Sequence, residues 1–311
     1  ASVRPCICCH NACFNMAHYN GVANDQTLAD NAGMARCALN PETMQSKKYK
    51  IEKAKRKKRV AVIGGGVGGM EAARVLALRG HDVTVYEKSQ SLGGVFVAAA
   101  APSFKEKDRE LLKWYEKELK DLGVKVEFGK EITDVSALDC DDFVIATGSK
   151  PRKLRVKGFE KTIEACDYLL GKKQVGDRVV VIGGGLTGCE IALDLFLKGK
   201  TPIIVEMKND IVAMKGVCLA NSSYLRDFFA YKNVEIHLNT ATTEICDNGV
   251  IAKDISGNEL KIEADSVIAS VGYIPAPAFG DKYKKRWVGD CNGIGNLRTV
   301  IWRAWDVAMK I

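Results

Sequence analysis

The chain carries an internal repeat that limits its fold more than any other feature. Residues 60–88 open with VAVIGGGVGG, and residues 179–208 open with VVVIGGGLTG, 119 positions later. Each copy starts with four apolar residues, which suit a short buried parallel strand, and passes through a glycine turn into residues with helical spacing. A second β-rich run closes each copy, DVTVYE in the first and TPIIVE in the second. Two complete βαβ units predict an α/β protein.

The three glycines of each turn have separate tasks. The first permits the tight turn out of the strand, the second lets a pyrophosphate approach the backbone, and the third allows the helix to pack closely on the strand. The helix N-terminus then offers free N–H groups to the diphosphate. We therefore expect two Rossmann-like dinucleotide-binding domains. The glycines are Gly64, Gly66 and Gly69 in the first copy and Gly183, Gly185 and Gly188 in the second.

One carboxylate closes each unit. Glu87 and Glu206 stand about 20 residues past the glycine turns, where a carboxylate accepts hydrogen bonds from ribose hydroxyls. Glu206 would also repel a 2′-phosphate, and the three residues after it include no Arg. The second site is therefore expected to prefer NADH to NADPH, and Lys208 acts against this preference.

Composition and charge argue against several classes of partner. The 311 residues have a formal net charge of +8, and residues 47–59 contain nine Lys or Arg and one Glu, so the rest of the chain is balanced. Such a run is typical of a solvated linker, and with Tyr49 as its one aromatic residue it does not indicate nucleic-acid binding. No stretch approaches the ~18 apolar residues of a membrane helix, and no targeting segment is visible. We expect no nucleic-acid or membrane partner, and a homo-oligomer is left open.

Three further runs accompany the repeats. DFVIATGSKPR (142–152) and DSVIASVGYIPAP (265–277) each join a short apolar strand to a glycine, and RWVGDCNGI (286–294) places a Gly-Asp pair before a helix-like end. With the two units, this order resembles flavoprotein reductases of the glutathione-reductase architecture. In that family the first unit holds FAD, an inserted second unit holds NAD(P)H, and the chain then returns to complete the FAD domain.

This resemblance implies two sets of cofactor-binding residues. We identify no catalytic side chain, because hydride transfer requires only that the protein bring the two cofactors together. The expected FAD residues are Gly64, Gly66, Gly69, Glu87, Lys88, Gly94, Thr147, Gly148, Gly289 and Asp290. The expected NAD residues are Gly183, Gly185, Gly188, Glu206 and Gly272.

Disulfide reductases of this architecture carry a redox-active cysteine pair soon after the first ribose carboxylate. Residues 88–110, KSQSLGGVFVAAAAPSFKEKDRE, contain no cysteine. Electrons that leave the flavin must therefore go to another acceptor.

Cysteines gather instead at the start of the chain, in RPCICCHNACF (4–14). Cys6, Cys9 and Cys13 have C-x2-C-x3-C spacing and Cys37 is the candidate fourth ligand, a set that suits a [4Fe–4S] cluster. Zinc sites more often show two separated C-x2-C pairs, and zinc or adventitious thiols are the alternatives. The total of eleven cysteines is odd and six are scattered singly, which suits reduced thiols in the cytoplasm.

The combined motifs resemble a narrower group. The C-x2-C-x3-C run, a Cys-x-x-Asn-Pro segment, IGGG-x-x-G-M-E-A-A and the turn Leu92–Gly94 are similar to the C-terminal half of the 2,4-dienoyl-CoA reductase and 2-enoate reductase group. That group includes bile-acid enoate reductases and is related to trimethylamine dehydrogenase. The resemblance implies that electrons pass from NADH to FAD, through a [4Fe–4S] cluster, to FMN in an N-terminal TIM-barrel half. That half reduces an activated C=C bond of an enoate or enoyl thioester.

No barrel precedes the cysteines here, so we expect a fragment whose partner is the FMN-binding barrel half of the same protein. The predicted order is a cluster segment (1–45), a basic linker (46–59), the first part of the FAD domain (60–150), the NAD(H) domain (151–264) and the second part of the FAD domain (265–311).

The sequence departs from the group's pattern in three places. Cys8 stands where a small residue is usual, Val95 replaces a polar residue, and the interval between Cys13 and Cys37 is long. Because of that interval, His10 and His18 are alternative fourth ligands.

Three other functions stay open. The chain could be an amine-dehydrogenase-like module whose second site binds ADP structurally, a stand-alone NADH:acceptor reductase, or a non-catalytic nucleotide-binding scaffold.

Overall fold

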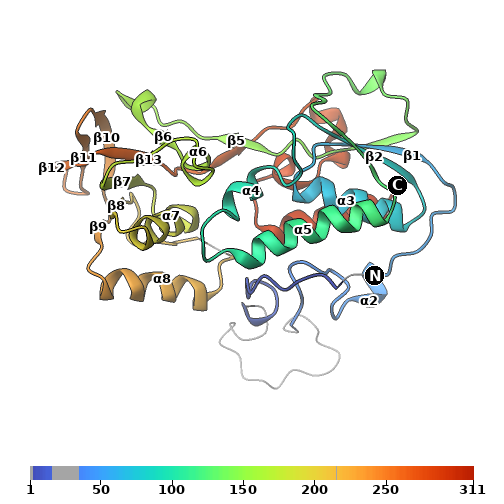
Figure 1. The fold of residues 1–311 in the computed structure, drawn as a ribbon, viewed down its shortest axis with the longest axis horizontal. Helices are drawn as coiled ribbons and strands as arrows, with labels where there is room; N and C mark the ends of the chain where they lie inside the picture. The colour runs from blue at the N-terminus through green and yellow to red at the C-terminus, as the bar shows by residue number, and fades with distance from the viewer. Residues whose placement is uncertain (1–2, 16–34, 215) are drawn as a thin grey trace. The chain divides into compact units, whose positions relative to one another are not determined.

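A computed structural model describes residues 3–15, 35–214 and 216–311 (Figure 1). The chain divides into two compact units. The first combines the N-terminal residues up to Val97 with Lys107–Lys150 and Ile274–Ile311, and the second combines Ala98–Glu106 with Pro151–Tyr273. One unit is thus inserted in the other, which agrees with the predicted fold class.

The first unit is built on a parallel sheet. In chain order, its helices and strands are α2 (Ser46–Tyr49), β1 (Arg59–Ile63), α3 (Val67–Leu78), β2 (Asp82–Glu87), α4 (Val95–Ala99), α5 (Glu106–Asp121), β3 (Lys125–Phe128), η1 (Val135–Ala137), β4 (Asp142–Ile145), η3 (Asp281–Arg286), η4 (Gly289–Asn292) and α9 (Leu297–Ala308). The last two residues of α4 and the first residue of α5 belong to the second unit. The strands lie in the order β3–β2–β1–β4, and β1 pairs in parallel with both β2 and β4. Its run VAVI is buried, as a central parallel strand requires.

Helices cover this sheet with apolar faces. Leu111, Tyr115 and Leu119, spaced four residues apart on α5, are all buried. Helices α3 and α9 share one hydrophobic core, to which Met70 and Trp305 contribute fully buried side chains. The start of α3, which faces the glycine turn, is therefore held on a rigid support.

The second unit contains another parallel sheet and a smaller antiparallel one. In chain order, its elements are η2 (Phe159–Lys161), β6 (Ile163–Glu164), α6 (Ala165–Leu169), β7 (Arg178–Ile182), α7 (Leu186–Leu197), β8 (Thr201–Val205), α8 (Leu219–Tyr231), β9 (Glu235–His237), β10 (Ala241–Cys246), β11 (Gly249–Lys253), β12 (Glu259–Glu263) and β13 (Ser266–Ala269). The parallel sheet has the order β6–β13–β7–β8–β9, and β10, β11 and β12 form the antiparallel sheet. Strands β7 and β8 and helix α7 repeat the arrangement of β1, β2 and α3.

Two short strands carry the chain between the units. These strands, β5 (Ser149–Pro151) and β14 (Tyr273–Pro275), form a two-stranded sheet. The expected return to the first unit at residue 265 is therefore too early. Strand β13, which starts at residue 266, still belongs to the second sheet. It pairs with β6 and β7 there, and its Val267 and Ile268 are buried.

The described N-terminal residues pack on the first unit. Leu39 and Tyr49 are buried in the core that α3 and α9 share, and Ile7 and Cys37 pack against it. The segment predicted as a basic linker, residues 46–59, thus begins with a helix that is anchored by Tyr49 and ends in β1. Most of its Lys and Arg side chains are exposed, as a solvated strip would be.

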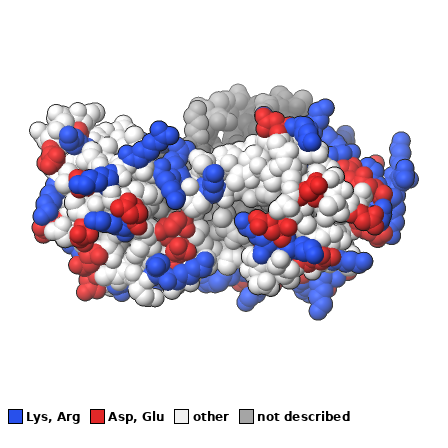
Figure 2. Space-filling model, turned by 90° about the horizontal axis from the view of Figure 1, so that it is seen from above, with Lys and Arg blue, Asp and Glu red and all other residues white. Residues whose placement is uncertain are grey.

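Charged side chains of both signs share the surface. On the face shown in Figure 2, Lys and Arg side chains are interspersed with Asp and Glu side chains. Within the described residues, no helix combines the length and the apolar character that crossing a membrane would require.

Candidate functional site

The first glycine turn joins β1 to α3 at the carboxyl edge of the sheet. Gly64 has a φ of +105°, and a Cβ there would overlap the carbonyl oxygen of Ala146. A Cβ at Gly69 would overlap the carbonyl oxygen of Gly64, so helix and turn touch through backbone atoms alone. Gly66 caps the N-terminus of α3, and a Cβ there would meet no described atom within 4 Å. The space over Gly66 is thus open to an anion at the helix N-terminus.

The second turn, between β7 and α7, has the same geometry. Gly183 has a φ of +104°, and a Cβ there would overlap the carbonyl oxygen of Ser270. A Cβ at Gly188 would overlap the carbonyl oxygen of Gly183, whereas one at Gly185 would meet no described atom within 4 Å. Each glycine of the second copy therefore meets the same constraint as its counterpart in the first.

The two carboxylates are fixed in the same way beside their turns. Glu87 accepts hydrogen bonds from the backbone N–H of Gly65 at 2.7 Å and of Ser89 at 2.7 Å. Glu206 accepts hydrogen bonds from the N–H of Gly184 at 2.6 Å and of Lys208 at 2.8 Å. Each carboxylate oxygen retains a lone pair for a further donor, such as a ribose hydroxyl.

The turn at Gly93 and Gly94 lies against the first glycine turn, between β1 and α3. Gly93 forms a bridge with Gly66, and its N–H donates to the carbonyl oxygen of Gly65 at 2.9 Å. A Cβ at Gly94 would approach the Cα of Gly66 to 3.2 Å. Lys88, the other predicted FAD residue in this stretch, is exposed directly after Glu87. The structure thus places Gly94 and Lys88 next to the residues that surround the open space over Gly66.

The remaining predicted FAD residues meet near the start of α3. Thr147 donates through its hydroxyl to the carbonyl oxygen of Ala276 at 2.8 Å, and the carbonyl oxygen of Gly148 accepts from the N–H of Ala276 at 3.0 Å. A Cβ at Gly68 would approach the Cα of Gly289 to 3.1 Å, so η4 lies directly against the helix. Gly68 was not among the predicted FAD residues. Its signal is the additional glycine of GGGVGG, which the second copy, GGGLTG, replaces with Thr187.

Asp290 is a half-buried carboxylate in η4. Its oxygens accept hydrogen bonds from the hydroxyl of Ser149 at 3.1 Å and from the N–H of Gly295 at 3.3 Å. Burial raises the pKa of Asp290, and these two hydrogen bonds only partly oppose that rise.

We expect Asp290→Asn to stabilise the FAD-free protein more at neutral pH than at acid pH. A raised pKa means that the folded protein binds more protons than the unfolded chain, so the carboxyl's contribution to stability falls as pH rises from its ordinary pKa of 3.8 through the raised value. Unfolding midpoints of the variant and the original protein, measured from about pH 4 to about pH 7, should therefore diverge. A constant difference over this range would contradict the burial argument.

The last predicted NAD residue, Gly272, lies just before β14. Its carbonyl oxygen accepts a hydrogen bond from the N–H of Arg152 at 2.9 Å. The nearby Ser270 supplies the carbonyl oxygen that lies over Gly183, so this segment passes the second glycine turn. Val95, which departs from the group's pattern, is an exposed residue at the start of α4.

The four predicted cluster cysteines lie in two neighbouring segments. The N–H of Arg36 donates to the carbonyl oxygen of Ala12 at 2.8 Å, which joins the segment of Cys37 to that of Cys6, Cys9 and Cys13. Burial raises the pKa of Cys9, and the negative charge of the other three thiolates contributes to that rise. The thiol of Cys9 therefore lies within electrostatic range of each of the other three.

These thiols do not form the ligand shell of a single ion. Among the described residues, no three His, Cys, Asp or Glu side chains converge closely enough to hold one metal ion. A [4Fe–4S] cluster would be held by four cysteine thiolates, the number that Cys6, Cys9, Cys13 and Cys37 supply. The described residues include all eleven cysteines, Cys8 among them, and no disulfide bond joins any two of them. Of the two alternative ligands, His10 lies in the cysteine segment and His18 lies outside the described residues.

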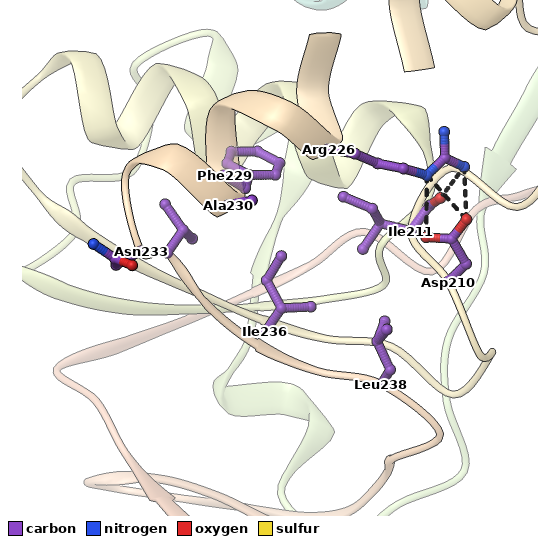
Figure 3. A pocket seen from close by; sticks show the side chains of 9 residues that line it. Asp210, Ile211, Arg226, Phe229, Ala230, Asn233, Ile236 and Leu238 are labelled. Carbon is purple, nitrogen blue, oxygen red and sulfur yellow. Dashed lines mark hydrogen bonds and ion pairs between the residues drawn. The ribbon is translucent and has the colours of Figure 1, made fainter. Parts of the chain in front are cut away.

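A separate pocket lies in the second unit, between α8 and β9 (Figure 3). It has a volume of about 430 Å³ and an apolar lining that includes Ile211, Phe229 and Leu238. Its charged pair is internally satisfied, because Arg226 binds Asp210 at 2.8 Å and the carbonyl oxygen of Ile211 at 2.8 Å. None of the residues predicted from the sequence lines this pocket.

Comparison with known proteins identifies the family. The profile described as pyridine nucleotide-disulphide oxidoreductase matches residues 33–140 and 58–289, more than half of the chain. The chain belongs to the pyridine nucleotide-disulphide oxidoreductase family. This assignment accounts for the two dinucleotide-binding units and their insertion.

The curated relatives of this oxidoreductase are about twice its length. Both alignments cover 99% of the chain. The chain is 38% identical to the cinnamate reductase of Clostridium sporogenes and 34% identical to the NADH oxidase of Thermoanaerobacter brockii. It covers 46% and 48% of those proteins, so it spans about half of their length.

A solved complex of 2-naphthoyl-CoA reductase matches 98% of the chain with a TM-score of 0.84 and 29% identity, and the chain covers 46% of it. The thioredoxin reductase of T. acidophilum, at 23% identity and a TM-score of 0.65 over 82% of this chain and 97% of its own, shares the fold alone. Together these matches confirm the resemblance to the enoate reductase group. The chain thus belongs to a family of FAD- and NAD(H)-binding oxidoreductases and is related to enoate and enoyl-CoA reductases.

Proposed function

We propose that this chain is the electron-input half of an enoate-type reductase, with FAD in the first unit and NADH in the second. The observation that carries the proposal is the matched geometry of the two turns. In both units the second glycine leaves an open helix N-terminus, and the terminal carboxylate accepts a backbone N–H at 2.6–2.7 Å. A repeat kept only for packing would need glycine at the first and third positions of each turn, where a Cβ would clash. It would not need glycine at the second position, Gly66 or Gly185, where a Cβ has room.

The residues of the chain bind and orient the cofactors. The N-termini of α3 and α7 would hold the two diphosphates, Glu87 and Glu206 would accept hydrogen bonds from ribose hydroxyls, and Asp290 would lie toward the flavin ribityl chain. When bound, NADH supplies a hydride, FAD accepts it, and an iron–sulfur cluster transfers single electrons.

We further propose that the second unit prefers NADH to NADPH. The carboxylate of Glu206 is held in place by two backbone donors, which keeps its charge where a 2′-phosphate would lie. The ammonium group of Lys208 is directed to the carbonyl oxygen of Ala213 at 3.1 Å, which favours a minor role for it in phosphate binding.

The two cysteine segments are proposed to hold a [4Fe–4S] cluster together, through Cys6, Cys9 and Cys13 in the first and Cys37 in the second. Support comes from the C-x2-C-x3-C spacing and from the backbone hydrogen bond between Arg36 and Ala12, which joins the segment of Cys37 to that of the other three cysteines. Cys8 and His10 have φ values of +54° and +52°, an uncommon conformation that bends the segment tightly between the three cysteines.

The acceptor is proposed to be an FMN-binding barrel half of the same full-length protein. The chain matches about half of the cinnamate reductase and about half of the 2-naphthoyl-CoA reductase, whose names point to an unsaturated or aromatic acid or its CoA thioester as substrate. The cysteines of the described residues form no disulfide bond, which suits a reducing compartment and supports a cytoplasmic location.

The test is the visible spectrum of the FAD-reconstituted protein before and after anaerobic NADH. We expect NADH to bleach the flavin absorbance, and equimolar NADPH to act at least about tenfold more slowly. An oxidised flavin that persists with NADH would contradict the proposal and favour the module that binds ADP structurally. A protein that cannot take up FAD would also contradict it.

We expect Cys9→Ser to remove the iron–sulfur absorbance while leaving reduction of FAD by NADH unchanged. The thiolate of Cys9 is a proposed ligand, whereas the glycine turns that bind the dinucleotides do not involve it. Cys8→Ser is the matched control, because the adjacent thiol is not a proposed ligand and its loss should leave the iron content unchanged. Equal iron loss in both variants would contradict the ligand assignment.

A further inference from the structure

Glu71 is a fully buried carboxylate on α3 that dinucleotide binding does not use. Its two oxygens lie 3.1 Å and 3.1 Å from Nη2 of Arg4, and the hydroxyl of Tyr115 donates to it at 2.9 Å. Nε of Arg74, one turn along α3, lies 3.5 Å from the same carboxylate. Two guanidinium groups and a phenol thus enclose one buried negative charge.

Aromatic rings complete the enclosure. The guanidinium carbon of Arg4 lies 4.6 Å from the centre of the Trp114 ring, and that of Arg74 lies 5.5 Å from the Trp305 ring. The Nη1 atom of Arg4 is buried with no hydrogen-bond partner among the described residues. A buried ion pair contributes little net stability compared with apolar packing, but the loss of one partner is costly because the other charge is left uncompensated. Such a pair is better suited to fixing a position than to stabilising a core.

The internal repeat supplies a control for this position. Glu190, the counterpart of Glu71 on α7, pairs with Lys105 at 2.5 Å, and both side chains are about a fifth exposed. The side chains of Arg4 and Glu71 are 11% and 0% exposed. Burial of the carboxylate is therefore a property of the first unit and not of the dinucleotide-binding motif.

The partner of Glu71 belongs to the cysteine segment. Arg4 precedes Cys6 by two residues, so its ion pair joins the segment that carries Cys6, Cys9 and Cys13 to the helix that begins at the first glycine turn. Helix α9 holds the other segment, since the indole N–H of Trp302 donates to the carbonyl oxygen of Cys37 at 3.1 Å. Helices α3 and α9 share one core, so both cysteine segments are anchored to the same rigid body.

We propose that Glu71, acting through Arg4, is a positioning residue that holds the first three cluster cysteines in place on the flavin-binding unit. This inference rests on the proposed cluster function. In this proposal the Arg4–Glu71 ion pair holds the thiols of Cys6, Cys9 and Cys13 in position before a cluster binds.

The experiment measures amide hydrogen exchange over residues 3–15 and the iron content after anaerobic reconstitution, on the full chain. In Arg4→Met and in Glu71→Gln we expect exchange about tenfold faster over residues 3–15 and at least about half of the iron lost. Arg4→Lys keeps the charge and should restore most of both quantities. Glu190→Gln is the matched control on α7 and should change neither.

The outcomes test the anchoring role of the Arg4–Glu71 ion pair separately from the proposed cluster function. Exchange over residues 3–15 in Arg4→Met that equals that of the original protein would overturn the proposal, even if Glu71→Gln fails to fold. Faster exchange that Arg4→Lys does not reverse would also overturn it, because the charge would then be irrelevant. If the original protein takes up no iron while Arg4→Met still exchanges faster, the anchor stands and the proposed cluster function fails.

Discussion

Gly185→Val is expected to abolish reduction of the flavin by NADH while the protein keeps its FAD and its thermal stability. Gly185 has a φ of −69° and a ψ of 179°, a conformation that valine adopts without strain. A Cβ at this position would meet no described atom, so the added side chain occupies only the space over the N-terminus of α7. That space is where the diphosphate of NADH is proposed to bind, and a branched side chain would exclude it.

The matched variant Gly66→Val should have the opposite effect. Gly66 has the same extended conformation and the same open surroundings in the first unit, so valine there should prevent uptake of FAD and leave binding of NADH intact. Flavin absorbance after purification and the NADH dissociation constant distinguish the two variants. Loss of FAD from Gly185→Val would mean that the two sites have been assigned in the wrong order.

The sequence was sufficient to predict the two α/β units because their constraints are local. Strand, turn, helix and carboxylate follow one another within 30 residues in each copy, and each glycine has a steric reason that holds in any chain with this fold. The same reasoning located Glu87 and Glu206, whose roles depend only on their place at the end of a strand.

The features that the sequence did not predict depend on contacts between distant residues. The burial of Glu71 follows from Arg4, 67 residues away, and Glu190 shows that the motif itself does not require it. The end of the second unit was placed too early because the apolar run at 266–269 suits either sheet, and only its pairing with β7 decides between them. The contact between Gly68 and Gly289 likewise joins segments that are adjacent only in the folded chain.

Gly69→Ala is expected to destabilise the first unit by about 3 kcal/mol or more, the upper end of what overpacking costs. The added Cβ would overlap the carbonyl oxygen of Gly64 and approach the Cβ of Ala146 to 3.2 Å. Backbone atoms of β1 and β4 hold both neighbours in place, so α3 would have to move away from the sheet that it packs on.

The sign of this change is informative by itself. In an unobstructed helix, replacing glycine with alanine raises stability by about 1 kcal/mol, so a loss at Gly69 isolates the cost of the close approach. Gly66→Ala is the control: it adds the same methyl group three residues earlier, where a Cβ meets no described atom. Urea unfolding of the FAD-free proteins measures both variants without interference from the cofactor. Equal midpoints for Gly66→Ala and Gly69→Ala would mean that α3 is not held on the sheet by this contact, and the rigid placement of its N-terminus over the diphosphate would lose its structural basis.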